Sequence, residues 1–276
     1  MAASKDRKVV LTGAAGGIGT MIRPLLGPLY PGLVLSDRVK PANLQPGETF
    51  VAADITKPDE FAALLKGADS LIHLGGHSVE GPWDAILQAN IIGCYNAFEA
   101  ARQAGVKRVI FASSNHAVGF YRRRQKIGAD VTVRPDSRYG VSKAFGEALG
   151  AMYADKHGMR VTCLRIGNVG ARPIDVRRLA IWISPEDLVQ LMRIGLDHPD
   201  IHFEILYGAS DNAAAWWDNS RARKLGYRPT GKGEDHRAYA ESEQVKVGAD
   251  PVGDVFQGGA FCSMEFSGDV KRAGPS

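Results

Sequence analysis

The stretch that decides the fold is Lys8-Val9-Val10-Leu11-Thr12-Gly13-Ala14-Ala15-Gly16-Gly17-Ile18-Gly19-Thr20. The apolar run before Thr12 predicts a buried strand, and the apolar residues after Gly17 recur at helical spacing. Between them, Gly13 allows a tight turn, Gly16 lets the backbone approach a pyrophosphate, and Gly19 lets the helix pack closely on the strand. A helix N-terminus favours an anion because its N–H groups are unpaired and its dipole is positive there. The order of strand, glycine turn and helix therefore predicts a nucleotide-binding turn.

A second strand is predicted at 33–37, and it ends in Asp37. In a dinucleotide-binding fold an acid at this place accepts hydrogen bonds from the adenosine ribose and repels a 2′-phosphate. Arg38 follows and has the charge to bind that phosphate instead, and a strand-end acid also suits an ordinary turn. In the context of the glycine turn, Asp37 favours NAD over NADP as the cofactor.

Strands and helices alternate as far as Gly170. A third strand at 50–55 contains Asp54, which we expect to reach the adenine amino group. A fourth strand runs into Gly75 and Gly76, whose small size leaves room for a ligand at the C-terminal edge of a parallel sheet, whereas His73 is interpreted as structural. Further elements are predicted at 57–65, 83–104 and 137–157 (helices) and at 109–112 and 161–166 (strands). The pattern predicts an α/β protein with a Rossmann-like, doubly wound parallel sheet and helices on both faces.

Tyr139 and Lys143 are four residues apart in the predicted helix 137–157, so their side chains lie on one face. A free tyrosine, with a pKa of about 10, is a poor base at neutral pH, but a nearby ammonium and a positive nicotinamide ring favour the phenolate. A phenolate suits the role of general base. This spacing is common by chance, and it becomes informative here because it follows a nucleotide-binding turn and a series of alternating units.

The regular alternation stops after Gly170. Short helices at 185–196 and 213–225 are expected to flank a strand at 203–206, and the tail from Gly231 is polar. We interpret residues 1–170 as a NAD-binding domain that carries the catalytic residues. Residues 171–276 then form a small substrate-binding lobe and a C-terminal tail, packed as one unit with the first domain.

Composition argues against several other classes of protein. The formal charge is only +4, and the cluster Arg122, Arg123, Arg124 and Lys126 is interpreted as a solvated loop, or else as a positive potential that draws an anionic substrate. The sequence contains neither the cysteine and histidine spacing of a zinc finger nor a basic helix with interleaved aromatic residues, so it gives no indication of nucleic-acid binding. Three cysteines, Cys94, Cys163 and Cys262, are far apart and lack metal-ligand spacing, so we expect reduced thiols and no metal site.

The apolar segments are all shorter than the ~18 to 20 residues that span a membrane. The N-terminus leads directly from Ser4-Lys5-Asp6-Arg7 into the first strand, without the pattern of a signal peptide. We therefore expect a cytoplasmic protein with no membrane association.

Six motifs spread over nearly the whole chain resemble the short-chain dehydrogenase/reductase superfamily, and in particular its extended, sugar-modifying branch. They are Thr12-Gly13-x-x-Gly16-x-x-Gly19, Asp69 through His73-Leu74-Gly75-Gly76, Asn90-x-x-Gly93, Ser113-Ser114, Tyr139-x-x-x-Lys143 and Arg165-x-x-Asn168. The resemblance implies that Ser114 and Tyr139 hold the reacting hydroxyl and that Lys143 binds the nicotinamide ribose. The catalytic residues implied are thus Ser114, Tyr139 and Lys143.

Further runs resemble the uronate dehydrogenase family within that branch. They are residues 73–80 (HLGGHSVE), 111–116 (FASSNH), 207–210 (YGAS), 216–220 (WWDNS) and 256–259 (FQGG). The resemblance implies oxidation of the anomeric carbon of D-glucuronate or D-galacturonate with NAD to an aldarolactone, by a homo-oligomer. It also implies that the sugar is contacted by Ser78, Ser114, Asn115, His116 and Tyr139, with its carboxylate on Arg177. Asn168, a further expected substrate contact, stands where that family leads us to expect serine.

The cofactor is expected to contact the ends of the first four strands and the catalytic helix. The predicted contacts are Gly13, Ala15, Gly16, Gly17, Ile18, Gly19, Asp37, Arg38, Asp54, Ile55, Leu74, Gly75, Gly76, Tyr139 and Lys143. Two other functions remain open from the sequence: a sugar-nucleotide epimerase or dehydratase with the same motifs, and a non-catalytic dinucleotide sensor. The presence of Ser114, Tyr139 and Lys143 favours an enzyme over a sensor.

Overall fold

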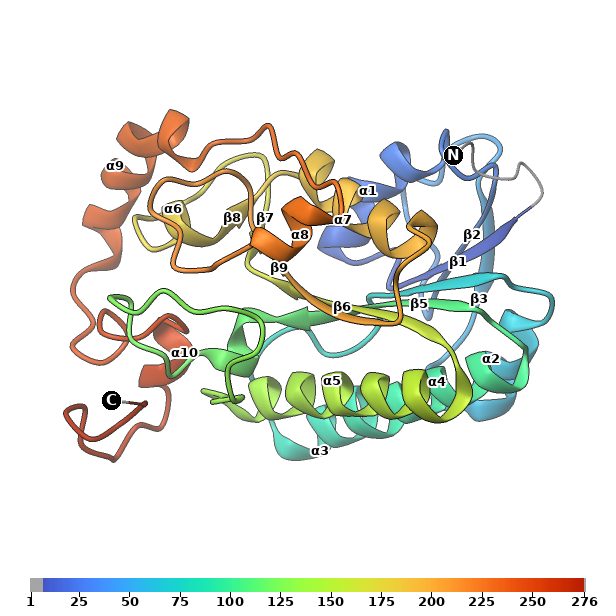
Figure 1. Ribbon diagram of the computed structural model, residues 1–276, viewed down its shortest axis with the longest axis horizontal. Helices are drawn as coiled ribbons and strands as arrows, with labels where there is room; N and C mark the ends of the chain where they lie inside the picture. The colour runs from blue at the N-terminus through green and yellow to red at the C-terminus, as the bar shows by residue number, and fades with distance from the viewer. Residues whose placement is uncertain (1–6, 276) are drawn as a thin grey trace.

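A seven-stranded sheet forms the centre of the computed structural model, which describes residues 7–275 (Figure 1). All neighbouring strands are parallel. In spatial order the strands are β3 (Thr49–Ala52), β2 (Gly32–Asp37), β1 (Lys8–Thr12), β4 (Ser70–His73), β5 (Arg108–Ser114), β6 (Arg160–Ile166) and β9 (Phe203–Gly208). The chain winds outward in both directions from β1 and β4, so the sheet is doubly wound, as predicted.

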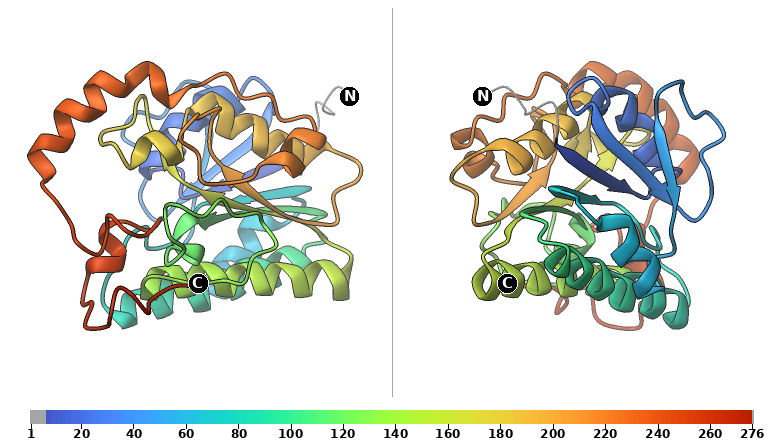
Figure 2. Two further views of the ribbon diagram at one scale, coloured as in Figure 1. Left: turned by 60° about the vertical axis from the view of Figure 1, so that its left-hand side comes forward. Right: turned by 90° about the vertical axis from the view of Figure 1, so that its right-hand side faces the viewer.

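Helices cover both faces of the sheet (Figures 1 and 2). Helices α1 (Gly17–Leu26) and α7 (Pro185–Asp197) pack on one face, and α2 (Pro58–Leu65), α4 (Gly93–Gln103) and α5 (Arg138–His157) on the other. Strand β1 contributes side chains to the hydrophobic cores on both faces of the sheet. Val9 and Leu11 pack with α1 and α7, whereas Val10 packs on the opposite face. Burial on two faces explains why the strand is apolar throughout.

Helix α5 runs along the sheet, and its first turns contain Tyr139 and Lys143. The Ser137 hydroxyl caps it by accepting a hydrogen bond from the backbone N–H of Gly140 (3.0 Å). Gly158 ends it in the left-handed conformation, with φ of 66°. The predicted helix at 137–157 is therefore confirmed, and Tyr139 and Lys143 lie in its first two turns.

The predicted helix at 83–104 is present, with an irregularity that the sequence did not reveal. It consists of α3 (Trp83–Ile86), a π-helical segment (Leu87–Ile92) and α4. Asn90 projects from the π-helical segment, and its amide clamps the backbone of His77 by accepting from the N–H (2.7 Å) and donating to the carbonyl (2.9 Å). The irregular segment thus holds the loop that follows β4.

The region after Gly170 contributes more to the sheet than expected. The strand predicted at 203–206 is β9, which pairs with β6 as the seventh strand of the main sheet, and α7 packs on the same sheet. The predicted boundary at residue 170 therefore does not coincide with the edge of the sheet, and the division into two units stays a prediction. The other elements of this region are β8 (Trp182–Ile183), α6 (Arg178–Ile181), α8 (Ser220–Lys224), α9 (Arg237–Val247) and α10 (Ala260–Ser263), with a 3₁₀ turn at Gly233–His236. Before Gly170, β7 (Asn168–Val169) pairs with β8, and a 3₁₀ turn at Asn115–Val118 follows β5.

The helix predicted at 213–225 is wrong over its first half, because α8 contains only Ser220–Lys224. Among the preceding residues, 213–214 form a turn and Trp217 makes an isolated bridge with Ile127. The Trp216 carbonyl accepts a hydrogen bond from the Ile127 N–H (2.9 Å), and Trp217 stacks on Tyr207 of β9 with ring centroids 4.8 Å apart. The bond to Ile127 joins segments far apart in the chain, so tertiary packing overrides the local preference for helix.

The basic cluster is not simply a solvated loop, because Arg122 and Arg123 fasten the C-terminal segment. Arg122 donates to the carbonyls of Val270 (2.9 Å) and Ala273 (3.2 Å). Arg123 donates to the carbonyl of Gly253 (2.7 Å) and also pairs with Asp254. The interpretation as solvated charges is wrong for these two arginines, which tie the end of the chain to the loop after β5.

Candidate active site

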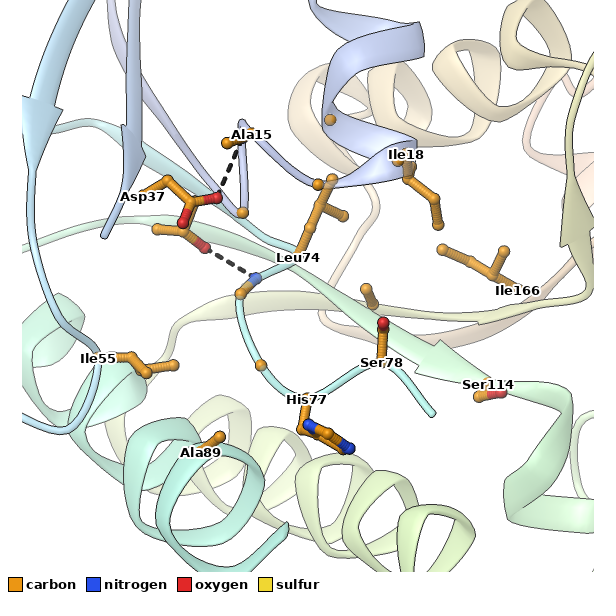
Figure 3. A pocket seen from close by; sticks show the side chains of 18 of the residues that line it. Ala15, Ile18, Asp37, Ile55, Leu74, His77, Ser78, Ala89, Ser114 and Ile166 are labelled. Atoms are coloured by element: carbon orange, nitrogen blue, oxygen red, sulfur yellow. Dashed lines mark hydrogen bonds between the residues drawn. The ribbon is translucent and has the colours of Figure 1, made fainter. Parts of the chain in front are cut away.

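A cavity of about 860 Å³ lies at the C-terminal edge of the sheet, beside the switch point between β1 and β4 (Figure 3). Ligands of doubly wound sheets bind at this place. All but one of the predicted site residues line it; they are Gly13, Ala15, Gly16, Gly17, Ile18, Gly19, Asp37, Arg38, Asp54, Ile55, Leu74, Gly75, Gly76, Ser78, Ser114, Asn115, His116, Tyr139, Lys143 and Asn168. The exception is Arg177.

The glycine turn between β1 and α1 forms one end of the cavity. Gly13 has φ of +71°, and a Cβ there would lie 2.9 Å from the backbone nitrogen of Gly75. A Cβ at Gly19 would lie 2.3 Å from the carbonyl oxygen of Gly13, so only glycine lets α1 start this close to the strand. A Cβ at Gly17 would meet no atom within 4 Å. The turn therefore presents bare backbone and a helix N-terminus to the cavity, an arrangement that fits a pyrophosphate.

Asp37 braces this turn as well as lining the cavity. Its Oδ2 accepts a hydrogen bond from the Ala15 N–H (3.0 Å), which Figure 3 shows as a dashed line, and its Oδ1 accepts from the Arg38 N–H (2.7 Å). The carboxylate thus lies at the end of β2 beside the glycine turn. It has the position and the charge to meet an adenosine ribose.

Asp54 and the loop after β4 form the walls next to Asp37. Hydrogen bonds from the backbone and hydroxyl of Thr56 hold the pKa of Asp54 below its usual value, so the group is ionised at neutral pH. On the other wall, the Thr12 hydroxyl accepts a hydrogen bond from the Gly75 N–H (3.2 Å) and bonds Nδ1 of His73 (2.8 Å). Burial lowers the pKa of His73 to about 3, which keeps it neutral and agrees with its structural interpretation.

Tyr139, Lys143 and Ser114 meet where α5 passes the end of β5. The tyrosine and lysine side chains are buried, and the Lys143 Nζ lies 5.3 Å from the centre of the Tyr139 ring. Nζ also donates to the carbonyl oxygen of Ala112 (2.8 Å), which fixes the ammonium beneath the cavity. Ser114, the last residue of β5, accepts a hydrogen bond from the His116 N–H (3.2 Å). The arrangement holds a phenol, an ammonium and a hydroxyl around one end of the cavity.

His116 is held by a residue that the sequence reading missed. Its Nδ1 lies 2.7 Å from Oδ2 of Asp136, a carboxylate whose side chain is fully buried. The ring of Phe261, from α10, stacks on the imidazole with centroids 3.9 Å apart. Asp136 occurs in the run Arg134-Pro135-Asp136-Ser137, which signals a helix start but gives no indication of a histidine partner.

Arg177 lies behind the cavity and reaches it through Asn115. In the amide orientation that satisfies both partners, the Asn115 oxygen accepts from Nη2 of Arg177 (3.1 Å) and its nitrogen donates to the Ile166 carbonyl (3.3 Å). Nε of Arg177 donates to the Gln257 carbonyl (2.9 Å). Burial lowers the pKa of Arg177 to about 10, a value at which the guanidinium stays charged at neutral pH.

Other predictions from composition concern the chain as a whole. Cys94, Cys163 and Cys262 are free and buried, in agreement with the expected thiols. Within residues 7–275, no group of histidine, cysteine and carboxylate side chains has the arrangement of a metal site. Across the same described residues, no helix combines the length and the apolar character needed to cross a membrane.

A dinucleotide-sized cavity on a doubly wound sheet, with a Tyr/Lys pair at one end, defines a dehydrogenase-like protein of the Rossmann class. The model of the NAD dependent epimerase/dehydratase family matches residues 9–198, which include the glycine turn, Ser114 and the Tyr/Lys pair. The chain belongs to that family, and within it to the uronate dehydrogenase group, as its similarity to individual members indicates.

Those members match nearly the whole chain. It is 43% identical over 263 residues to the uronate dehydrogenase of Pseudomonas putida, an alignment that covers 95% of this chain and 97% of that protein. Glucuronic acid dehydrogenase from Chromohalobacter salexigens has the same fold, with a TM-score of 0.89 at 41% identity over 97% of this chain and 99% of that one. A mutant of the Agrobacterium tumefaciens uronate dehydrogenase complexed with NAD gives 0.87 at 39% identity, over 93% and 97% of the two chains. The resemblance predicted from the sequence is confirmed.

Proposed function

We propose that this chain is an NAD-dependent uronate dehydrogenase, which oxidises the anomeric C1 of D-glucuronate or D-galacturonate to the aldarolactone. The observation that carries the proposal is the 43% identity to a uronate dehydrogenase over 95% of the chain. The cavity supports it independently, because it joins a glycine turn suited to a pyrophosphate with a buried Tyr/Lys pair. Together they support a dinucleotide site and a general base in one cavity.

The residues at the end of β5 and in α5 perform the chemistry in this proposal. Tyr139 accepts the proton of the C1 hydroxyl, and Ser114 donates a hydrogen bond that orients that hydroxyl oxygen. Lys143 holds the nicotinamide ribose, and its positive charge favours the phenolate of Tyr139. Bound NAD supplies the hydride acceptor. Loss of the hydroxyl proton and of the C1 hydride leaves the carbonyl of the lactone.

The sugar lies in this proposal against Ser78, Asn115, His116 and Asn168, with its carboxylate directed at Arg177. Asn115 supports the last assignment, since it lines the cavity and its amide oxygen accepts from Nη2 of Arg177. In the described part of the chain no carboxylate lies within ion-pair distance of this guanidinium, and the charges of Asp175 and Asp136 act on it from further away. An arginine can bind a carboxylate through two parallel hydrogen bonds.

We also propose that the protein is a cytoplasmic homo-oligomer. The helical layer made of α3, the π-helical segment, α4 and α5 leaves large apolar side chains exposed, namely Trp83 (48%), Ile92 (37%), Tyr95 (49%) and Val141 (46%). Large exposed apolar side chains on one helical layer are consistent with a surface for association. Sedimentation of the purified protein tests this part of the proposal.

The test of the function is a panel of free sugars with NAD or NADP, followed at the nicotinamide absorbance. One NADH formed per uronate oxidised, with little signal from glucose or galactose, supports the proposal. A sugar-nucleotide epimerase gives no net NADH from free uronates, and a dinucleotide sensor binds NAD without turnover of any sugar. Either of those results contradicts it.

A further inference from the structure

The turn Gln257-Gly258-Gly259 is fastened firmly to the body of the protein. The Gln257 side chain is fully buried; its Oε1 accepts from Nε1 of Trp217 (2.9 Å) and its Nε2 donates to the carbonyls of Arg122 (3.2 Å) and Gln125 (2.8 Å). The Gln257 N–H donates to the Tyr121 carbonyl (2.8 Å). A glutamine with every polar group satisfied fixes the position of the turn, because each broken bond would leave a buried group unpaired.

One side of this turn packs against Arg177. The Gln257 carbonyl accepts from Nε of the arginine (2.9 Å). Gly259 has φ of +65° and ψ of −137°, and a Cβ there would lie 2.6 Å from Nε and 2.7 Å from Cδ of Arg177. Any residue larger than glycine at this position therefore displaces the arginine. The turn sets both where the guanidinium lies and which way it faces.

The other side packs against the buried carboxylate that holds His116. A Cβ at Gly258 would lie 1.9 Å from Oδ2 of Asp136, the same oxygen that lies 2.7 Å from Nδ1 of His116. The Gly258 N–H donates to the Gly119 carbonyl (2.8 Å), and this hydrogen bond holds the backbone of the turn against the Asp136 carboxylate. Three residues after Gly258, Phe261 stacks on the imidazole of His116.

We infer that the turn Gln257-Gly258-Gly259 is a positioning element of the substrate site, which aligns Arg177 through Gly259 and His116 through Asp136. This inference rests on the proposed function and deepens it, because these two side chains are the proposed contacts to the uronate. None of the three turn residues lines the cavity, so they act through their neighbours. Two consecutive glycines are needed because a Cβ at Gly258 would clash with Asp136 and a Cβ at Gly259 would clash with Arg177.

The first test is Gly259→Ala, assayed with glucuronate as the varied substrate. Displacement of Arg177 weakens binding of the charged group in both ground and transition states, so we expect KM to rise by about 10-fold or more while kcat changes less than about threefold. The Kd for NAD, measured by fluorescence, should be unchanged. An unchanged KM, or an equal loss in NAD affinity, overturns the inference.

Gly248→Ala is the matched control. Gly248 also combines a positive φ (77°) with an extended ψ (−174°), but a Cβ there would meet no atom within 4 Å. The control variant therefore carries similar backbone strain without touching a neighbour. It should keep the KM of the original protein, and a rise equal to that of Gly259→Ala would assign the effect to strain and overturn the inference.

A double-mutant cycle separates action through Arg177 from a general structural role. Arg177→Ala alone should cost about 10- to 150-fold in kcat/KM for glucuronate. Adding Gly259→Ala should then cost less than about twofold, because the side chain that it displaces is already absent. Losses that multiply in full contradict the inference.

Gln257→Ala keeps the inference testable if Gly259→Ala does not fold. This variant loosens the turn without adding an atom, and the KM for glucuronate should rise by about three- to tenfold in folded protein. A folded variant with an unchanged KM overturns the inference. Binding of galactarate, which has carboxylates but no anomeric hydroxyl, to the NAD complex gives a readout without turnover. If the original protein oxidises no uronate, the proposed function fails, whereas galactarate binding that Gly259→Ala weakens still supports the inference.

Discussion

The proposed cofactor half of the cavity and its proposed substrate half are built in different ways. The cofactor half consists of the turns after β1, β2, β3 and β4, so each strand delivers its own contact residues to the edge of the sheet. The proposed substrate half includes Asn115 and His116, which contact Arg177 and Asp136, with the turn 257–259 behind them. The hydrogen bonds that brace the proposed cofactor half, from Ala15 to Asp37 and from Gly75 to Thr12, join the ends of β1, β2 and β4, whereas Arg177 bonds Gln257, which lies much later in the chain. The proposed cofactor contacts thus follow from the order of the strands, and the proposed substrate contacts also need a segment from the C-terminal part of the chain.

The largest expected effect comes from the residue at the junction of the two halves. Tyr139→Phe removes the proposed proton acceptor and keeps the ring, so kcat should fall by about 10²- to 10⁴-fold. NAD binding, measured by fluorescence titration, should remain close to that of the original protein. A variant with near-normal kcat would show that Tyr139 is not the base, and a variant that no longer binds NAD would place the tyrosine in the cofactor half alone.

Removal of Arg177 should affect the substrate half only. Arg177→Ala is expected to lower kcat/KM for glucuronate by about 10- to 150-fold, with little change for glucose or galactose, because only the uronate carries a carboxylate. Arg178→Ala is the control, since that neighbouring arginine pairs with Asp175. Equal losses on charged and neutral sugars would indicate that Arg177 shapes the loop instead.

A smaller effect is expected from Asp136→Asn, which removes the charge that orients His116 but keeps the size of the side chain. We expect kcat/KM for glucuronate to fall by about tenfold, as for the loss of one charged hydrogen bond. Asp155→Asn provides the control, because Asp155 pairs with His202 in the same manner on the exposed surface (2.9 Å). If both variants show the same kcat/KM for glucuronate, the buried pair of Asp136 and His116 does not contribute to substrate binding.

The smallest change is expected in the cofactor half, where Asp37 both faces the ribose site and accepts from the Ala15 N–H. Asp37→Asn keeps an acceptor for that N–H and removes the negative charge. The ratio of kcat/KM for NAD to kcat/KM for NADP should therefore decrease by a factor of between several-fold and about tenfold. Asp37→Ala should lower affinity for both cofactors in addition. An original protein that already uses NADP as well as NAD would exclude Asp37 as the discriminator.

The sequence was sufficient for the parts of the protein that depend on local order. The glycine turn, the acid at the end of β2 and the Tyr/Lys pair each need only neighbouring residues, and all of them line one cavity. The helix predicted at 137–157 likewise matches α5 to within a residue. These signals are short in sequence because they arise from backbone geometry.

The features that the sequence did not reveal depend on contacts between distant segments. Residues 213–219 were expected to be helical, but Trp217 packs on Tyr207 and donates to Gln257, and this segment is not helical. The run Phe256-Gln257-Gly258-Gly259 was recognisable as a motif, yet its physical reason lies in the positions of Asp136 and Arg177. No periodicity or spacing encodes such a contact.

The dependence of Arg177 and His116 on the turn 257–259 has a consequence for synthesis of the protein. A growing chain leaves the ribosome from its N-terminus, and domains begin to fold in that order. The glycine turn and helix α5 emerge well before Gln257, whose side chain must still insert between Trp217 and the loop at Arg122 and Gln125. A partly synthesised chain would thus acquire its dinucleotide site first and its sugar site last.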